Sequence, residues 1–280
     1  MAMSDNFPLI PIPGRDGLWH IYARSPGGGG DVFSHLIPGK DAAILLDTGF
    51  GIGDLKGMVE GITDLPLIVV NTHNHPDHSF GNPQFDTIHI HSLDADLLNR
   101  LMEMPERVVP PEEEREYKYV QEDMVQPAPY KVVTIEDGHV FDLGGGYEVE
   151  VFHLPGHAPG GIALLDRKRR VLFSGDALVW TPTLIMGRPG WPCTPWHTVE
   201  KFRDGLLRLE AHMDEFDVVY PGHSRQALPT SIVTDMIACC NELIDGDLTV
   251  HYNILGNGSP VHVHGMAKIA FTEDRIHVKE

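Results

Sequence analysis

Short apolar runs separated by turn residues dominate the first third of the chain. Leu18–Arg24 alternates between apolar and polar positions, whereas Val32–Ile37 and Ala42–Leu46 are two apolar runs joined by a turn containing proline and glycine. Such runs indicate strands, and we predict a hairpin here. Gly53–Ile62 has a weak helical period, and Leu67–Asn71 is an apolar, β-branched run typical of a buried strand. The order of strand, helix and strand predicts an α/β unit.

The pattern changes in the middle of the chain and then returns to strands. Leu93–Met104 and Glu112–Met124 are expected to be helices joined by a proline-rich hinge. Further strands are predicted at Lys131–Ile135, Tyr147–His153, Ile162–Asp166, Val171–Ser174 and Asp217–Tyr220. Thr198–Met213 and Ser231–Ile244 have helical periodicity, and Leu248–Val278 has the pattern of short strands.

This mixed order of helices and strands makes the fold class α/β, or α+β in some schemes, with at least two sheets. A chain of 280 residues can bury a sizeable core. We expect one domain over residues 1–280, with a helical insertion at about 93–126 and a strand-like C-terminal extension at about 246–280.

Composition narrows the classes of function. There are 40 acidic and 21 basic residues, for a formal charge of −19, and this disfavours nucleic acid as a partner. No apolar run reaches about 18 residues and no targeting pattern is visible, so we expect a cytoplasmic protein without a membrane partner. Seventeen histidines accompany only three cysteines, which form no Cys-x-x-Cys motif. Any bound metal would therefore be held by histidine and carboxylate.

The segment with the clearest chemical signal follows the run that ends at Asn71. It reads His73-Asn74-His75-Pro76-Asp77-His78, three histidines and one aspartate within six residues. Residues two apart on an extended chain point to the same side, so His73 and His75 can converge on one ion. Asp77 and His78 lie in the turn beyond Pro76, where they can reach a second ion.

Three later segments also place a polar side chain after an apolar strand. They are Pro155-Gly156-His157, Ser174-Gly175-Asp176 and Pro221-Gly222-His223. Strand ends that converge are a common way for a rigid scaffold to position functional side chains. Five histidines and two aspartates are enough to fill two metal coordination spheres.

In this order of motifs, together with Asp47-Thr48-Gly49, the chain resembles the metallo-β-lactamase superfamily over roughly residues 15–245. The resemblance implies a four-layer αββα sandwich with a metal site at one edge of two sheets. It further implies that His73, His75 and His157 form one metal site. Asp77, His78 and His223 would form the second, with Asp176 as the bridging carboxylate.

The resemblance also implies a mechanism. Two divalent ions would generate a bridging hydroxide that attacks an electrophilic carbonyl or phosphorus, and Asp77 would orient it or accept its proton. Zn²⁺ is the ion we expect, although imidazole and carboxylate ligands also accept Fe or Mn. Asp47 has two readings: it holds a histidine ligand in orientation, or it serves the turn alone.

Departures from known branches narrow the substrate class. True β-lactamases of this fold have cysteine or serine where this chain has Asp176, and flavodiiron proteins have glutamate at the position of His75. The charge of −19 argues against a ribonuclease Z-like role. Glyoxalase II-like enzymes end in a basic helical domain and lactonases carry a tyrosine after the bridging aspartate, both of which are missing here. The ligand pattern is nevertheless closest to these last two branches.

The segment 178–197 is rich in tryptophan and proline and directly follows Asp176. We predict that it overhangs the site as an apolar substrate wall. The alternative is a loop that only packs on the core. Its candidate substrate contacts are Trp180, Arg188, Trp191, Trp196 and His197.

The leading hypothesis is a binuclear hydrolase that cleaves a small ester, thioester or lactone. The alternatives are an iron-dependent oxidoreductase resembling persulfide dioxygenases, a phosphodiesterase, and a metal-binding protein without activity. The expected partner is a small-molecule substrate. Whether the 93–126 insertion forms a second wall of the site or a homodimer contact is left open by the sequence.

Overall fold

The computed structural model describes residues 9–28, 30–187, 194–254 and 258–278. Its backbone groups into two compact units. Unit 1 comprises Met1–Ile135 and Phe141–Glu148, and unit 2 comprises Glu136–Val140 and Val149–Glu280.

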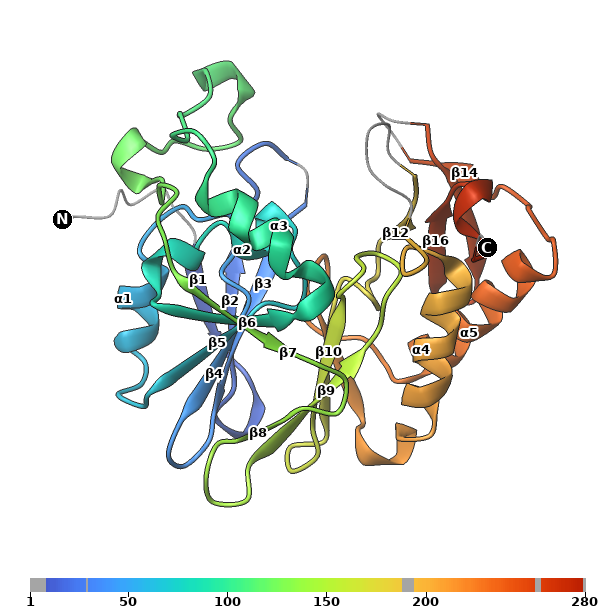
Figure 1. Ribbon diagram of the computed structural model, residues 1–280, viewed down its shortest axis with the longest axis horizontal. Coiled ribbons are helices and arrows are strands. Elements are labelled where there is room, and N and C mark those ends of the chain that lie inside the picture. The colour runs from blue at the N-terminus through green and yellow to red at the C-terminus, as the bar shows by residue number, and fades with distance from the viewer. Residues whose placement is uncertain (1–8, 29, 188–193, 255–257, 279–280) are drawn as a thin grey trace. The chain divides into compact units, whose positions relative to one another are not determined.

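Unit 1 is built on one seven-stranded sheet whose strands follow one another in chain order (Figure 1). The strands are β1 (Leu9–Pro13), β2 (Trp19–Ala23), β3 (Val32–Pro38), β4 (Ala43–Leu46), β5 (Leu67–Val70), β6 (Thr87–His91) and β7 (Lys131–Ile135). The sheet is antiparallel from β1 to β4 and parallel from β4 to β7. The predicted hairpin is therefore confirmed as β3 and β4.

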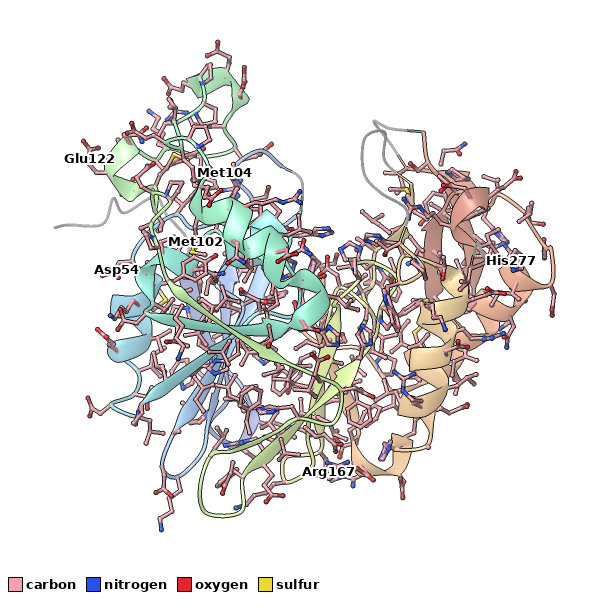
Figure 2. All side chains as sticks on the ribbon, viewed as in Figure 1. Asp54, Met102, Met104, Glu122, Arg167 and His277 are labelled. Carbon is pink, nitrogen blue, oxygen red and sulfur yellow. The ribbon has the colours of Figure 1, made fainter. Side chains whose placement is uncertain are left out.

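Helices make the crossovers that the parallel strands require. They are α1 (Leu55–Glu60), α2 (Pro76–Ser79) and α3 (Ser92–Met102). The side chain of Asp54, labelled in Figure 2, caps α1 by accepting a hydrogen bond of 2.8 Å from Gly57 N. Buried aliphatic residues such as Leu36, Leu45 and Ile88 form the core of this unit.

The strands of unit 2 belong to two sheets. The first has the order β13-β11-β10-β9-β8 and the second the order β12-β16-β15-β14. Their strands are β8 (Val140–Asp142), β9 (Glu148–His153), β10 (Ile162–Asp166), β11 (Val171–Gly175), β12 (Thr183–Ile185), β13 (Val218–Pro221), β14 (Tyr252–Asn253), β15 (Pro260–His264) and β16 (Ala267–Phe271). The predicted strands of the C-terminal segment are thus present, and β12 joins them in parallel with β16.

Two amphipathic helices, α4 (Val199–Glu210) and α5 (Ser231–Ile244), pack against each other, and α5 also packs on β15 and β16. Thr198 caps α4 by accepting a hydrogen bond from Lys201 N. Apolar side chains from both helices, among them Phe202, Leu206 and Met236, belong to one continuous core. Both helices agree with the predicted ranges.

One prediction needs correction, and one strand was not predicted. Glu112–Met124 is not a helix: only the 3₁₀ turns η3 (Glu112–Glu114) and η4 (Gln121–Asp123) occur there. The glutamate run forms one exposed turn after Pro110 and Pro111, and no apolar stripe anchors a longer helix. Strand β1 was missed because Pro11 and Pro13 interrupt it, but an edge strand tolerates proline.

The remaining short 3₁₀ helices are η1 (Arg15–Gly17), η2 (Asn82–Gln84), η5 (Met213–Glu215) and η6 (Glu273–Arg275). Along the described residues, no helix is both long and apolar enough to cross a membrane.

Candidate functional site

In unit 1, four of the predicted ligands emerge where β5 ends. We call His73, His75, Asp77 and His78 the first cluster. The ring centroid of His73 lies 4.6 Å from that of His75 and 4.3 Å from that of His78. Asp77 Oδ2 lies 3.8 Å from His78 Nε2. The one-turn helix α2 starts at Pro76, and it sets Asp77 and His78 beside the two preceding histidines.

Asp47 supports the first cluster through hydrogen bonds. Its side chain is buried and accepts hydrogen bonds from Thr72 N (2.7 Å), Thr72 Oγ1 (2.8 Å) and His78 Nδ1 (2.8 Å). Because His78 donates its Nδ1–H in this bond, the lone pair that can bind a metal ion is on Nε2 of the same ring. The contact matches the first of the two readings of Asp47, in which the carboxylate orients a ligand.

Sequence reasoning missed three residues that support the same segment. Thr72 Oγ1 lies 3.0 Å from His73 Nδ1, and the amide of Asn71 donates to the carbonyl of His78. Asp94, fully buried in the first turn of α3, accepts from Asn74 N at 3.0 Å. Asp94 lies on the buried side of α3 with Ala95 and Leu98. An acidic residue at such a position was the sequence feature that could have indicated a buried hydrogen-bonding role.

In unit 2, three predicted ligands lie close together after three different strands. We call His157, Asp176 and His223 the second cluster; they follow β9, β11 and β13. Asp176 Oδ2 lies 3.4 Å from His157 Nε2 and 3.3 Å from His223 Nε2. One carboxylate oxygen thus lies within 3.4 Å of two imidazole nitrogens.

Local backbone geometry fixes His157. Its Nδ1 donates to the carbonyl of Leu184 at 3.1 Å, and this leaves Nε2 to face Asp176. The preceding Gly156 has φ +134°, and a Cβ atom there would lie 2.7 Å from Cβ of Phe202. Only glycine permits this close approach of the loop to α4.

The donor atoms of both clusters suit a metal ion. Imidazole nitrogen and carboxylate oxygen are ligands for Zn²⁺, Fe and Mn. The seven side chains His73, His75, Asp77, His78, His157, Asp176 and His223 all belong to groups that could hold a metal ion. A metal-binding role is therefore consistent with the residues present.

The predicted substrate contacts have different surroundings. Arg188 and Trp191 lie outside the described residues. Trp196 packs on His153, with ring centroids 5.2 Å apart, and Trp180 is half-buried with two cations against its ring. Burial is the main cause that lowers the pKa of His197 to about 4, and the charges of Arg275 and His157 lower it further. At neutral pH, His197 is therefore an uncharged imidazole.

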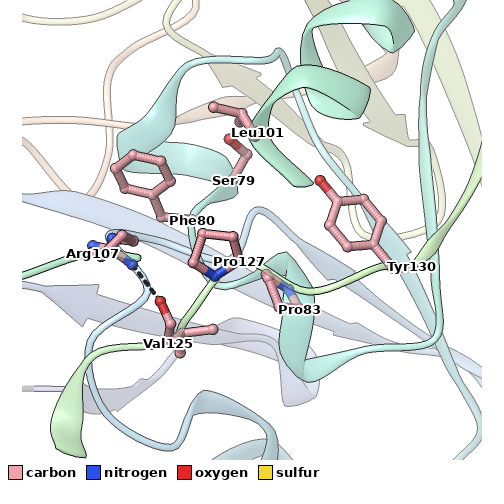
Figure 3. A pocket seen from close by; sticks show the side chains of 8 residues that line it. All are labelled: Ser79, Phe80, Pro83, Leu101, Arg107, Val125, Pro127 and Tyr130. Atoms are coloured by element: carbon pink, nitrogen blue, oxygen red, sulfur yellow. Dashed lines mark hydrogen bonds between the residues drawn. The ribbon is translucent and has the colours of Figure 1, made fainter. Parts of the chain in front are cut away.

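A small cavity lies beside α2 in unit 1 (Figure 3). Its lining residues are Ser79, Phe80, Pro83, Leu101, Arg107, Val125, Pro127 and Tyr130. At about 10 Å³ it has room for at most one water molecule, so it is no acyl pocket. Arg107 closes it: the guanidinium stacks 4.1 Å from the Phe80 ring centroid and donates to the carbonyls of Phe50, Gly51 and Val125.

Comparison with known proteins agrees with this arrangement. Residues 27–240 match the model of the metallo-beta-lactamase superfamily. Human acyl-coenzyme A thioesterase MBLAC2 is 30% identical over 230 residues, which cover 74% of this chain and 78% of that protein. Hydroxyacylglutathione hydrolase GloC of Haemophilus influenzae is 30% identical over 89 residues, 31% of this chain and 38% of its own.

Among solved structures, a beta-lactamase domain protein from Burkholderia ambifaria superposes with a TM-score of 0.63 at 18% identity. The match covers 86% of this chain and 79% of that protein. At this level of identity the comparison concerns the fold alone, and it confirms the predicted fold class.

Proposed function

Because the chain belongs to the metallo-beta-lactamase superfamily, we propose that this metal-dependent hydrolase cleaves the thioester bond of a small acyl thioester. Its second cluster has Asp176 where true β-lactamases have cysteine or serine. The two relatives of 30% identity named above are an acyl-coenzyme A thioesterase and a hydroxyacylglutathione hydrolase. The observation that carries the proposal is the placement of one carboxylate oxygen of Asp176 between two imidazole nitrogens.

We further propose that both clusters together hold two divalent ions, with zinc as the expected metal. His73, His75 and His157 would serve one ion, Asp77, His78 and His223 the other, and Asp176 both. When bound, such ions supply Lewis acidity and lower the pKa of coordinated water. The hydrogen bonds from His78 to Asp47 and from His157 to Leu184 O support this role, since each fixes the tautomer of a ligand.

Asp77 is the residue we assign to proton handling. Its side chain is about one-third exposed, whereas that of His78 beside it is fully buried. A carboxylate that is reachable from solvent and fixed on a one-turn helix can accept a proton from the attacking water and pass it to the leaving thiolate. The buried neighbours Asp47 and Asp94 already accept hydrogen bonds, from Thr72 and His78 and from Asn74 N respectively, and so they are suited to positioning.

The test combines metal analysis with hydrolysis. Wild type should contain two zinc-like ions per chain and hydrolyse an acyl-N-acetylcysteamine thioester faster than a lactone or a phosphodiester. Asp77→Ala should lower kcat by 10²-fold or more. Asp64→Asn, which removes an exposed carboxylate in the same unit, is the matched control and should leave kcat unchanged.

Two results would overturn the proposal. One is a thioesterase activity that Asp77→Ala leaves intact. The other is a single iron per chain with oxygen-dependent oxidation of a sulfur substrate, which would establish the oxidoreductase alternative instead.

A further inference from the structure

Two cations of unit 2 are gathered on one tryptophan. Arg225 Cζ lies 3.6 Å and Lys268 Nζ 4.2 Å from the ring centroid of Trp180, and Lys268 also donates to the Trp180 carbonyl at 2.7 Å. We call these three residues the Trp180 cluster. Cation–π contact holds both charges in place without neutralising either of them.

Among the described residues, neither cation of the Trp180 cluster has an acidic partner. The contrast with the rest of unit 2 is clear, because Arg167 (labelled in Figure 2), Arg169 and Arg170 all form ion pairs. Acidic residues outnumber basic ones by 40 to 21 in the chain, so acids were available. Burial and the charge of Arg225 both lower the pKa of Lys268. An anion bound at this point would relieve that repulsion.

The backbone ties this positive pair to the second cluster. Arg225 N donates to the carbonyl of His223 at 2.8 Å across Ser224, whose φ is +69°. A three-residue turn of this kind is strained for any residue other than glycine, and such strain often marks functional segments. Ser224 Oγ donates to Thr181 Oγ1 at 3.3 Å, which links the turn to the residue after Trp180. Arg225 therefore lies only two residues along the chain from the candidate metal ligand His223.

We propose that the Trp180 cluster binds the phosphate groups of a phosphorylated thiol carrier, such as coenzyme A, on the leaving-group side of the thioester. The inference rests on the proposed function for the thioester, whereas the phosphate site rests on the cluster itself. The guanidinium of Arg225 can make paired hydrogen bonds to phosphate oxygens, and Lys268 adds a point charge. Two cations on one ring, neither paired with an acid among the described residues, suit a doubly charged phosphate better than a single carboxylate.

The first experiment measures binding apart from catalysis. Adenosine 3′,5′-bisphosphate is titrated calorimetrically into wild type, Arg225→Gln, Lys268→Gln and Lys168→Gln, with adenosine as the uncharged probe. Each cluster variant should raise the Kd about tenfold or more, because each removes a charge-assisted hydrogen bond. Lys168→Gln removes an exposed charge elsewhere in unit 2 and should leave the Kd unchanged. Absence of binding to wild type, or equal affinity in all variants, would overturn the proposal.

The second experiment compares three thioesters of the same acyl group. Arg225→Gln and Lys268→Gln should raise KM about tenfold for the coenzyme A thioester and leave it unchanged for the N-acetylcysteamine and glutathione thioesters. An equal rise for the glutathione thioester would contradict phosphate recognition, since that carrier offers only carboxylates. If wild type hydrolyses none of the three, the proposed function fails, and the calorimetric result still decides on the phosphate site.

Discussion

The first cluster takes four candidate ligands from six consecutive residues, whereas the second takes three from the ends of three separate strands. The first depends on a buried polar network in which Asp47 receives three hydrogen bonds. The second depends on the packing of β9, β11 and β13 and on the loops that follow them. A contiguous motif thus needs internal polar support, while a dispersed one needs an accurate scaffold.

This difference leads to distinct sensitivities. In the first cluster, we expect the site to be most sensitive to substitution of the residues that hydrogen-bond to the ligands. In the second cluster, we expect it to be most sensitive to substitution of residues that let the loops approach the core, such as Gly156. Four substitutions test this division.

Removing the central carboxylate of the second cluster should have the largest effect. Asp176→Asn keeps the shape of the side chain but loses the charge that lies between His157 and His223. We expect kcat/KM to fall by about 10³-fold and bound metal to fall with it. Asp217→Asn, an exposed carboxylate in the same unit, is the control. Normal metal content and activity in Asp176→Asn would contradict the assigned role.

Gly156→Ala tests the scaffold of the second cluster. The new Cβ would meet Phe202 at 2.7 Å and the residue would keep a φ of +134°. We expect unfolding free energy to fall by about 3 kcal/mol, from overpacking and backbone strain together. Gly146→Ala also has a positive φ but no atom within 4 Å, so its urea unfolding curve isolates the strain. Equal losses in both variants would rule out the packing argument.

Asp47→Asn tests the polar support of the first cluster. Asparagine tolerates the φ of +61° at this position, so the backbone can be retained. Loss of the charged acceptor for His78 should weaken metal binding about 10- to 100-fold. Metal affinity measured by competition with a chelator provides the readout, with Asp64→Asn as reference. Unchanged affinity would assign Asp47 to the turn alone.

Arg107→Met should have the smallest effect. Burial lowers the pKa of Arg107 to about 10, so the guanidinium remains charged at neutral pH while it donates to three carbonyls beside α2. Its loss should cost about 2 kcal/mol in unfolding free energy. Thermal unfolding alongside Arg100→Met, an exposed arginine of α3, measures the difference. A Tm equal to that of the control would show that Arg107 does not support this segment.

The same contrast explains which parts of the site could be predicted from the sequence. The first cluster was visible because its ligands are adjacent, and the second because each ligand follows a glycine after an apolar run. Helix α5 was predicted at its observed limits, since Ser231–Ile244 has a clear apolar period. Glu112–Met124 was mistaken for a helix because charge alone does not anchor one.

The partners of the ligands were harder to predict. Asp94 lies 20 residues from the Asn74 amide that it accepts from, and Lys268 lies 88 residues from Trp180. No local periodicity reports contacts of this kind, because they arise only when the sheets assemble.

Metal stoichiometry shows whether the two clusters serve one pair of ions. Elemental analysis of the purified chain should find two zinc-like ions in wild type. It should find at most one in both His78→Ala, from the first cluster, and His223→Ala, from the second. Two ions retained in His223→Ala, or no metal in wild type, would contradict the account.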